Sequence, residues 1–182
     1  MTVFVSILTR KWMLTVLVLS CFVIGRLPAQ TKTQIRDFEL KDATNKTFRL
    51  SEHRGEVLVL SFIPDMDSKK TGSYWLGESR RWMEAVRQKF GDSLTIVGLK
   101  EMTDLPMFLP KSFVRAKLRK EPFPYLIDWK GNVFDKFSVG KKFALIVIDQ
   151  QGQVAYRTSE PFSAEKCKEV CAAIEKIKRH SG

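Results

Sequence analysis

The chain has 182 residues, which is enough for one domain with a buried core and too little for two domains of ordinary size. Hydrophobic residues make up 44% and charged residues 28%, a balance typical of a globular protein that excludes a chain disordered throughout. The net charge of +11 raises the question of an anionic partner. Because the basic residues are scattered and follow no nucleic-acid-binding motif, we expect a solvated basic surface and no nucleic-acid binding.

The N-terminal segment has the parts of a secretory signal peptide. Arg10 and Lys11 provide a positive start, residues 12–24 form an apolar run, and a small residue follows at the cleavage point. As a helix this run of 13 residues spans about 20 Å, short of the roughly 30 Å hydrocarbon core, so an uncleaved anchor is the lesser alternative. We therefore predict a signal peptide over residues 1–29 and one domain over residues 30–182, exported to the bacterial periplasm or secreted.

A second interpretation of the same segment rests on Cys21. Residues 18–21 resemble a bacterial lipoprotein box, in which the cysteine would be lipidated and would tether the protein to a membrane. Residues 22–24 continue the apolar run past this cysteine, where lipoproteins turn polar, and this favours the cleaved signal. Membrane attachment is expected only if Cys21 is lipidated or the signal stays uncleaved.

Downstream of this segment, predicted strands and helices follow one another. Continuous apolar runs predict strands buried on both faces of a sheet, and apolar residues at helical spacing predict amphipathic helices. The predicted strands are at 35–40, 48–51, 56–63, 94–99, 125–128, 143–149 and 154–157, and the predicted helices at 75–90, 106–120 and 163–179. This order predicts an α/β fold with a mixed central β-sheet flanked by helices and an N-terminal β-hairpin.

The buried sides of two helices can be predicted from their spacing. In the segment at 106–120, which Pro110 interrupts, we expect Phe113, Val114 and Leu118 to face the core. Ser163 is the expected cap of the last helix. Its expected apolar face consists of Ala164, Cys167, Val170, Cys171, Ile174 and Ile177.

Four stretches resemble the thioredoxin-like superfamily. Residues 37–42 with 48–51 resemble the opening hairpin of its redoxin and peroxiredoxin-like branch, and residues 57–63 resemble the strand that leads into the thioredoxin active site. Residues 145–157 resemble the later strand pair, and residues 123–133 resemble the YtfJ-type periplasmic proteins, which lack active-site cysteines. The resemblance implies a thioredoxin-like fold over nearly the whole predicted domain.

The resemblance also implies where the reactive thiols of a relative would lie. The thioredoxin cysteine pair would fall at Asp67 and Lys70, and the peroxiredoxin pattern would take Pro64, Ser68 and Thr71, with Thr71 in place of the reactive cysteine. A thiolate is the nucleophile of disulfide exchange and the group that peroxide oxidises, and none of these side chains supplies one.

The loop that presents substrate to the thiol in thioredoxins also departs from the pattern. Its proline would fall at about Phe143, and no proline stands between Pro124 and Pro161. The expected redox loop therefore lacks both the thiol and this proline.

Cys167 and Cys171 are the cysteines left after the predicted signal. They lie four residues apart on one helix face, so a redox pair is one interpretation. Core packing is the other, because both cysteines lie on the apolar stripe and a bridge within one helix strains disulfide geometry.

The remaining polar clusters carry weaker signals. We interpret Asp65 and Asp67, near Glu78, as part of a solvated loop. Neither His53 nor His180 has the sequence spacing of a zinc ligand set, so we predict no metal and no cofactor. The lysine pair at residues 69–70 suggests an anion site only as a minority interpretation, and the basic run at residues 115–120 reads as an exposed helix face.

Together these observations predict an exported thioredoxin-like protein without a CxxC motif that is non-catalytic and binds a periplasmic protein partner. The expected surface is the edge at residues 65–74, with Trp75 and Trp129 as anchors. The alternative is a thiol-disulfide oxidoreductase or a peroxiredoxin-like antioxidant protein that uses Cys167 and Cys171. A third possibility, suggested by the basic charge, is binding to an anionic surface.

Overall fold

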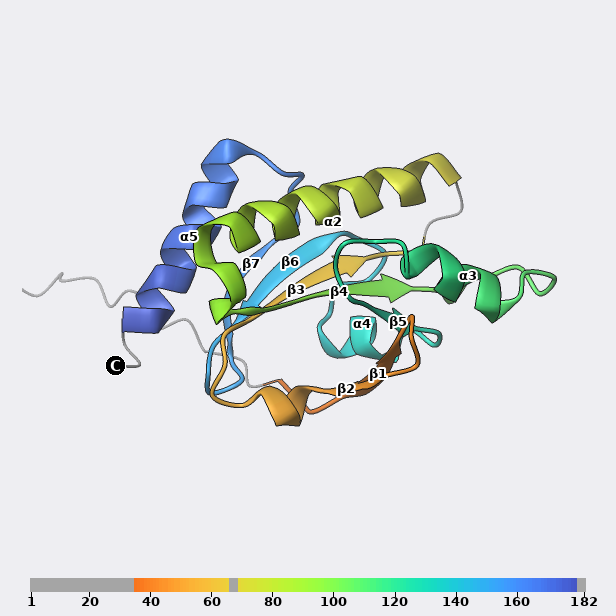
Figure 1. Cartoon of the computed structure of the whole chain (residues 1–182), viewed down its shortest axis with the longest axis horizontal. Helices are drawn as coiled ribbons and strands as arrows, with labels where there is room; N and C mark the ends of the chain where they lie inside the picture. Colours follow the sequence, from red (N-terminus) through yellow and green to blue (C-terminus); the bar gives the residue numbers. More distant parts are fainter. Residues whose placement is uncertain (1–34, 66–68, 180–182) are drawn as a thin grey trace, which may run out of the picture. The chain divides into compact units, whose positions relative to one another are not determined.

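A mixed β-sheet forms the centre of the computed structural model, which describes residues 35–65 and 69–179 (Figure 1). The predicted signal peptide and Cys21 lie outside the described residues. Among the described residues, no helix combines the length and the apolar character needed to cross a bilayer.

The sheet has seven strands in the order β2-β1-β5-β4-β3-β6-β7. The strands are β1 (Glu39–Asp42), β2 (Thr47–Arg49), β3 (Leu58–Ile63), β4 (Thr95–Glu101), β5 (Tyr125–Asp128), β6 (Ala144–Ile148) and β7 (Val154–Thr158). The helices are α2 (Lys69–Phe90), α3 (Lys111–Leu118), α4 (Asn132–Lys136) and α5 (Ala164–Arg179). Strand β3 pairs in parallel with β4 and antiparallel with β6, so it is an interior strand, and it is buried throughout.

The side chains of β3 alternate between two core layers because successive residues of a strand point to opposite faces. Val59 and Ile63 join the layer beneath α2, α3 and α5, whereas Leu60 and Phe62 join the layer that contains α4 and the segment before β1. Figure 1 shows α2 and α5 on one side of the sheet and α4 on the other. Each face of the sheet therefore buries its own apolar core.

The predicted fold class is confirmed, and the differences concern particular elements. The first strand begins at Glu39 and not at Ile35, because Asp37 accepts the N–H groups of Phe38 and Ser51 (both 2.9 Å) and holds this segment in an irregular path. Helix α2 begins at Lys69, six residues before the predicted start, since residues 69–74 carry no apolar periodicity by which a helix could be recognised.

Two expectations about the helices are wrong, and one helix was not predicted. Phe113 is 58% exposed, because Val114 and Leu118 alone fill the contact between α3 and the core. Ala164 is exposed at the first position of α5, although Ser163 caps that helix as expected by accepting the N–H of Lys166 (3.2 Å). Helix α4 was not predicted at all, because five residues are too short for a helical period to show.

Candidate functional site

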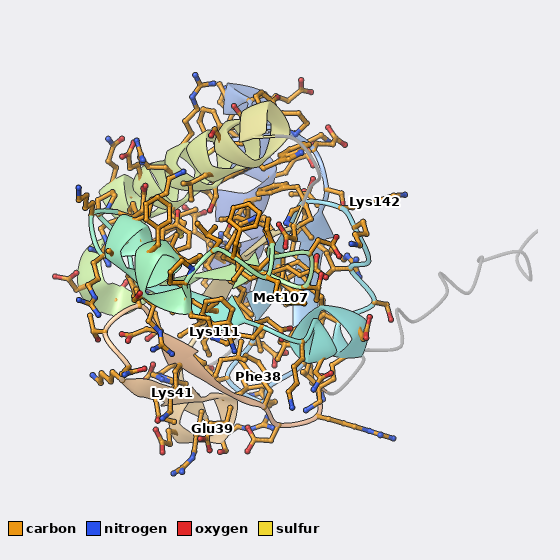
Figure 2. All side chains as sticks on the ribbon, turned by 90° about the vertical axis from the view of Figure 1, so that its right-hand side faces the viewer. Phe38, Glu39, Lys41, Met107, Lys111 and Lys142 are labelled. Atoms are coloured by element: carbon orange, nitrogen blue, oxygen red, sulfur yellow. The ribbon has the colours of Figure 1, made fainter. Side chains whose placement is uncertain are left out.

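The candidate site lies at the sheet edge where β3 and β4 end and α2 begins. Three segments meet there: Pro64 and Asp65 after β3, residues 102–110 after β4, and residues 140–143 before β6. Because β3 and β4 are parallel, their carboxyl ends lie at the same edge. Figure 2 views this edge from the right-hand side of Figure 1.

Glu101, at the end of β4, connects the segments that follow β3 and β4. Its side chain is 6% exposed, and its two carboxylate oxygens accept the N–H of Asp65 (3.1 Å) and the hydroxyl of Thr103 (3.2 Å). The Asp65 carboxylate in turn accepts the N–H of Asp104 (2.9 Å). A buried carboxylate is stable only when donors surround it, so these contacts fix both segments against each other.

Two lysines extend this network. The Lys100 ammonium donates to the Pro64 carbonyl (2.6 Å), and burial lowers the pKa of this lysine. Lys141 pairs with the carboxylate of Asp104 and so attaches the segment before β6 to the segment after β4. The three segments therefore form one connected edge.

An aromatic stack occupies the position at which the resemblance places the substrate-presenting proline. Phe143 is buried just before β6, and its ring stacks on Trp75 of α2 with centroids 5.0 Å apart and planes 8° apart. Tyr74 packs edge-on against Trp75 (4.9 Å) and is 49% exposed. Trp75 is thus half-buried beside the edge and not a fully exposed anchor.

The predicted redox-loop positions fall at this edge where they are described. Pro64 is buried directly after β3, and Lys70 and Thr71 belong to the first turn of α2. Asp67 and Ser68 lie outside the described residues.

The acids and the histidine singled out from the sequence that the structure describes do not combine into a metal site. Glu78 is buried on α2, where its carboxylate accepts the N–H of Phe162 (2.7 Å) and pairs with Arg81 (3.0 Å), so it does not join Asp65. His53 lies 3.0 Å from the Glu56 carboxylate and stacks on a phenylalanine, and His180 lies outside the described residues. Within residues 35–65 and 69–179, no three His, Cys, Asp or Glu side chains gather as metal ligands.

Cys167 and Cys171 lie far from this edge. Their sulfurs are 4.0 Å apart on α5, which packs on α2 near Lys89. Lys89 is 20 residues beyond the start of α2, which corresponds to about 30 Å along the helix. Burial, together with the neighbouring Cys167, raises the pKa of Cys171 to about 11, so its thiol stays protonated at neutral pH.

The most exposed apolar residues of this edge were not predicted from the sequence. Met107 is fully exposed and Phe108 is 86% exposed, in the segment between β4 and α3. Figure 2 labels Met107 between Lys111 and Lys142, on the face that looks toward the viewer. The available signal was three consecutive apolar residues between Pro106 and Pro110, outside any periodic element.

Trp129, the second expected anchor, lies just after β5. Its ring is half-buried, and the Lys111 ammonium lies 4.9 Å from the ring centroid. The Arg115 guanidinium lies 5.9 Å from the same centroid. Trp129 is therefore an aromatic platform beneath two cations of α3 and not a free hydrophobic surface.

The sheet order, the helix placement and this edge define a protein with a thioredoxin-like fold. Residues 31–157 match the AhpC/TSA family, and the chain belongs to that family. No curated protein is similar enough to count as a relative.

Solved structures support the same fold. The chain is similar to a protein described as the thiol:disulfide interchange protein DsbE from Chlorobium tepidum, with 20% identity, a TM-score of 0.60 and coverage of 80% of this chain and 96% of that one. It is also similar to the peroxidoxin BcpB from Mycobacterium tuberculosis (25% identity, TM-score 0.55, 80% and 96% coverage). A third is the exposed lipoprotein thioredoxin Etrx1 from Streptococcus pneumoniae (19% identity, TM-score 0.56, 77% and 99% coverage).

Proposed function

We propose that the chain is an exported, thioredoxin-like protein of the YtfJ type that binds a periplasmic protein partner and does not carry out thiol chemistry. One observation carries this proposal: the segment between β3 and the first turn of α2 offers carboxylates, hydroxyls and amines where relatives use a sulfur nucleophile. The Phe143–Trp75 stack is consistent with it, because aromatic rings stand where the resemblance places the loop proline.

The exposed residues at the same edge suggest how binding would occur. Met107, Phe108 and Tyr74 present apolar surface next to the connected segments. Aromatic residues and methionine are enriched in protein interfaces, and a pre-ordered surface loses less conformational entropy on binding. We therefore propose that the partner binds at this edge and contacts the exposed side chains of Tyr74, Met107 and Phe108.

Export is part of the proposal and has its own support. The N-terminal segment has the charge and hydropathy pattern of a secretory signal, and the pneumococcal neighbour is described as an exposed lipoprotein. Lipidation at Cys21 is the alternative form of the same export.

Crosslinking in the periplasm tests the binding surface. The full chain is expressed from its own N-terminus and compared with the variant Met107→Ser/Phe108→Ser. The matched control is Ala164→Ser/Ala172→Ser, which makes two exposed apolar positions of α5 polar. We expect one discrete crosslinked complex whose yield falls at least about tenfold in the first variant, because interface hot-spot residues each contribute more than about 1 kcal/mol. Equal yields from all three proteins would refute this surface.

A second candidate function is a thiol-disulfide oxidoreductase at Cys167 and Cys171. The observation in its favour is the 4.0 Å separation of the two sulfurs. Disulfide formation requires them to approach to about 2.05 Å, which α5 resists because the side chains lie along one helix. Thiol titration of the native protein distinguishes the two functions: a reversible loss of two titratable thiols at a defined redox potential supports the oxidoreductase, and two thiols that stay reduced exclude it.

A further inference from the structure

A cavity of about 340 Å³ lies between β1, the end of β5 and the start of α4. Its lining includes the indole of Trp129 and four basic side chains, those of Lys41, Arg115, Lys130 and Lys136. Figure 2 shows Lys41 of β1 and Phe38, just before that strand, on the same face as Lys111 of α3. The cavity is thus built from β1, β5, α3 and α4 with their flanking residues, and most of the charged side chains in its lining are cationic.

The two acids in the lining do not neutralise these cations. Glu39 pairs with Arg49, with 2.8 Å between its carboxylate oxygen and the guanidinium Nε. Asp128 is buried, and its two oxygens accept the backbone N–H groups of Lys130, Val133 and Phe134. The four cations of the lining outnumber its two carboxylates, and Glu39 pairs with an arginine outside the lining, so the cavity keeps an excess of positive charge.

Arg115 is the feature that points to a ligand. Its Nε is fully buried and is the only buried side-chain nitrogen or oxygen without a hydrogen-bond partner in the part of the chain that the structure describes. The guanidinium contacts the face of Trp129 but forms no ion pair with a described carboxylate. Buried polar groups are almost always paired, and a guanidinium fork matches the geometry of a phosphate or carboxylate.

We propose that this cavity binds a small oxyanion, a phosphate or a carboxylate group, held by Arg115 and the surrounding lysines. The anion balances the charge of Arg115 and of the lysines, and the outer nitrogens of the Arg115 guanidinium are its proposed donors, since solvent does not reach the Nε. The Trp129 ring forms one wall of the site and reports its occupation. This site goes beyond the proposed partner surface: it uses none of Tyr74, Met107 and Phe108, so either proposal can fail without the other.

The test is a titration of the full chain with inorganic phosphate and, in a second arm, with citrate. Both are run at constant ionic strength, with sodium chloride as the reference. They are followed by backbone amide NMR shifts and by tryptophan fluorescence, with Trp129→Phe as the fluorescence control because the chain has four tryptophans. We expect saturable NMR shifts centred on Trp129, Lys130 and Asn132. The anion with the smaller dissociation constant is the preferred ligand. NMR shifts that grow linearly with anion concentration, or that sodium chloride reproduces, would overturn the proposal, because screening of the surface charges by salt explains such shifts.

Two variants with the same loss of charge on α3 separate the site from the overall field. Arg115→Gln removes the fork, whereas Lys117→Gln removes an exposed cation of the same helix that does not line the cavity. We expect Arg115→Gln to weaken phosphate binding at least about tenfold and Lys117→Gln to change it by less than about threefold. Equal weakening in both variants contradicts the site. If Arg115→Gln fails to fold, the NMR shifts of the wild-type protein test the site alone. Shifts that lie away from Trp129 would refute the proposed site.

Discussion

Replacing Gly98 by alanine is the sharpest structural test of the sheet that positions the site. Gly98 on β4 is the register partner of Tyr125 on β5, and the Tyr125 ring lies across the space where a side chain would be. A Cβ at Gly98 would lie 2.2 Å from two carbons of that ring, far inside the usual contact distance of about 3.5–4.0 Å. The ring must therefore move by more than about 1 Å.

That movement disturbs a buried polar chain as well as the packing. The Tyr125 hydroxyl lies 3.4 Å from the Ser79 hydroxyl, which receives a hydrogen bond from Ser61 (2.8 Å). Overpacking costs about 1–3 kcal/mol, and a buried polar group left without its partner costs a similar amount. We expect Gly98→Ala to lower the free energy of unfolding by about 3–4 kcal/mol, a large part of the 5–15 kcal/mol typical of a domain.

Urea unfolding measures this loss as a lower midpoint at an unchanged slope. Gly77→Ala in α2 is the matched control, because a Cβ there meets no atom within 4 Å, and we expect it to stabilise the protein by about 0.5–1 kcal/mol. The variant Gly98→Ala/Tyr125→Ala should cost less than the sum of its single changes, since the clash disappears with the ring. A Gly98→Ala protein within about 0.5 kcal/mol of wild type would refute the β4–β5 register described above.

Three further predictions follow from buried titratable groups. Asp128→Ala leaves backbone N–H groups at the start of α4 without an acceptor and should destabilise the protein by about 2–3 kcal/mol. Asp128→Asn should cost less, because its amide oxygen can still accept. Urea unfolding measures both losses, and amide exchange shows whether they arise in α4. Burial raises the pKa of Tyr125 from its ordinary value of 10.0 to about 12, so between pH 10 and 12 the unfolded chain loses this proton while the folded protein keeps it, and the free energy of unfolding falls. Tyr125→Phe should make the free energy of unfolding depend less steeply on pH in this range. An unchanged pH dependence would contradict the burial of Tyr125. Burial also raises the pKa of Cys171 to about 11, so iodoacetamide at about pH 8 should modify Cys167 before Cys171. Mass spectrometry of the peptides measures the order of modification, and earlier modification of Cys171 would contradict its burial.

The parts of the fold predicted from sequence are those with a strong hydrophobic period. The apolar runs that form β3, β4 and β6 are buried on both faces, as is typical of interior strands of a sheet covered by helices. Helix α5 was predicted from its apolar stripe and its cap. These elements place the site edge, because the ends of β3 and β4 and the start of α2 define it.

The parts that escaped prediction depend on contacts between distant residues. Helix α4 forms because Asp128 caps it and Gly131 turns the chain with a positive φ of 73°, a pairing that no local period reveals. The edge network depends on Glu101, which a strand pattern presents as an ordinary polar residue until its partners Asp65 and Thr103 are known. The orphaned Arg115 Nε likewise belongs to a basic run that sequence alone assigns to solvent.

The central claim is that this member of the AhpC/TSA family works without thiol turnover, and an enzymatic assay tests it most directly. Insulin reduction and peroxide consumption are measured with the wild-type protein and with Cys167→Ser/Cys171→Ser, alongside a thioredoxin as the positive reference. The account predicts that both proteins match the protein-free blank in both assays. Wild-type turnover comparable to that of the thioredoxin, and its loss in the serine variant, would contradict it.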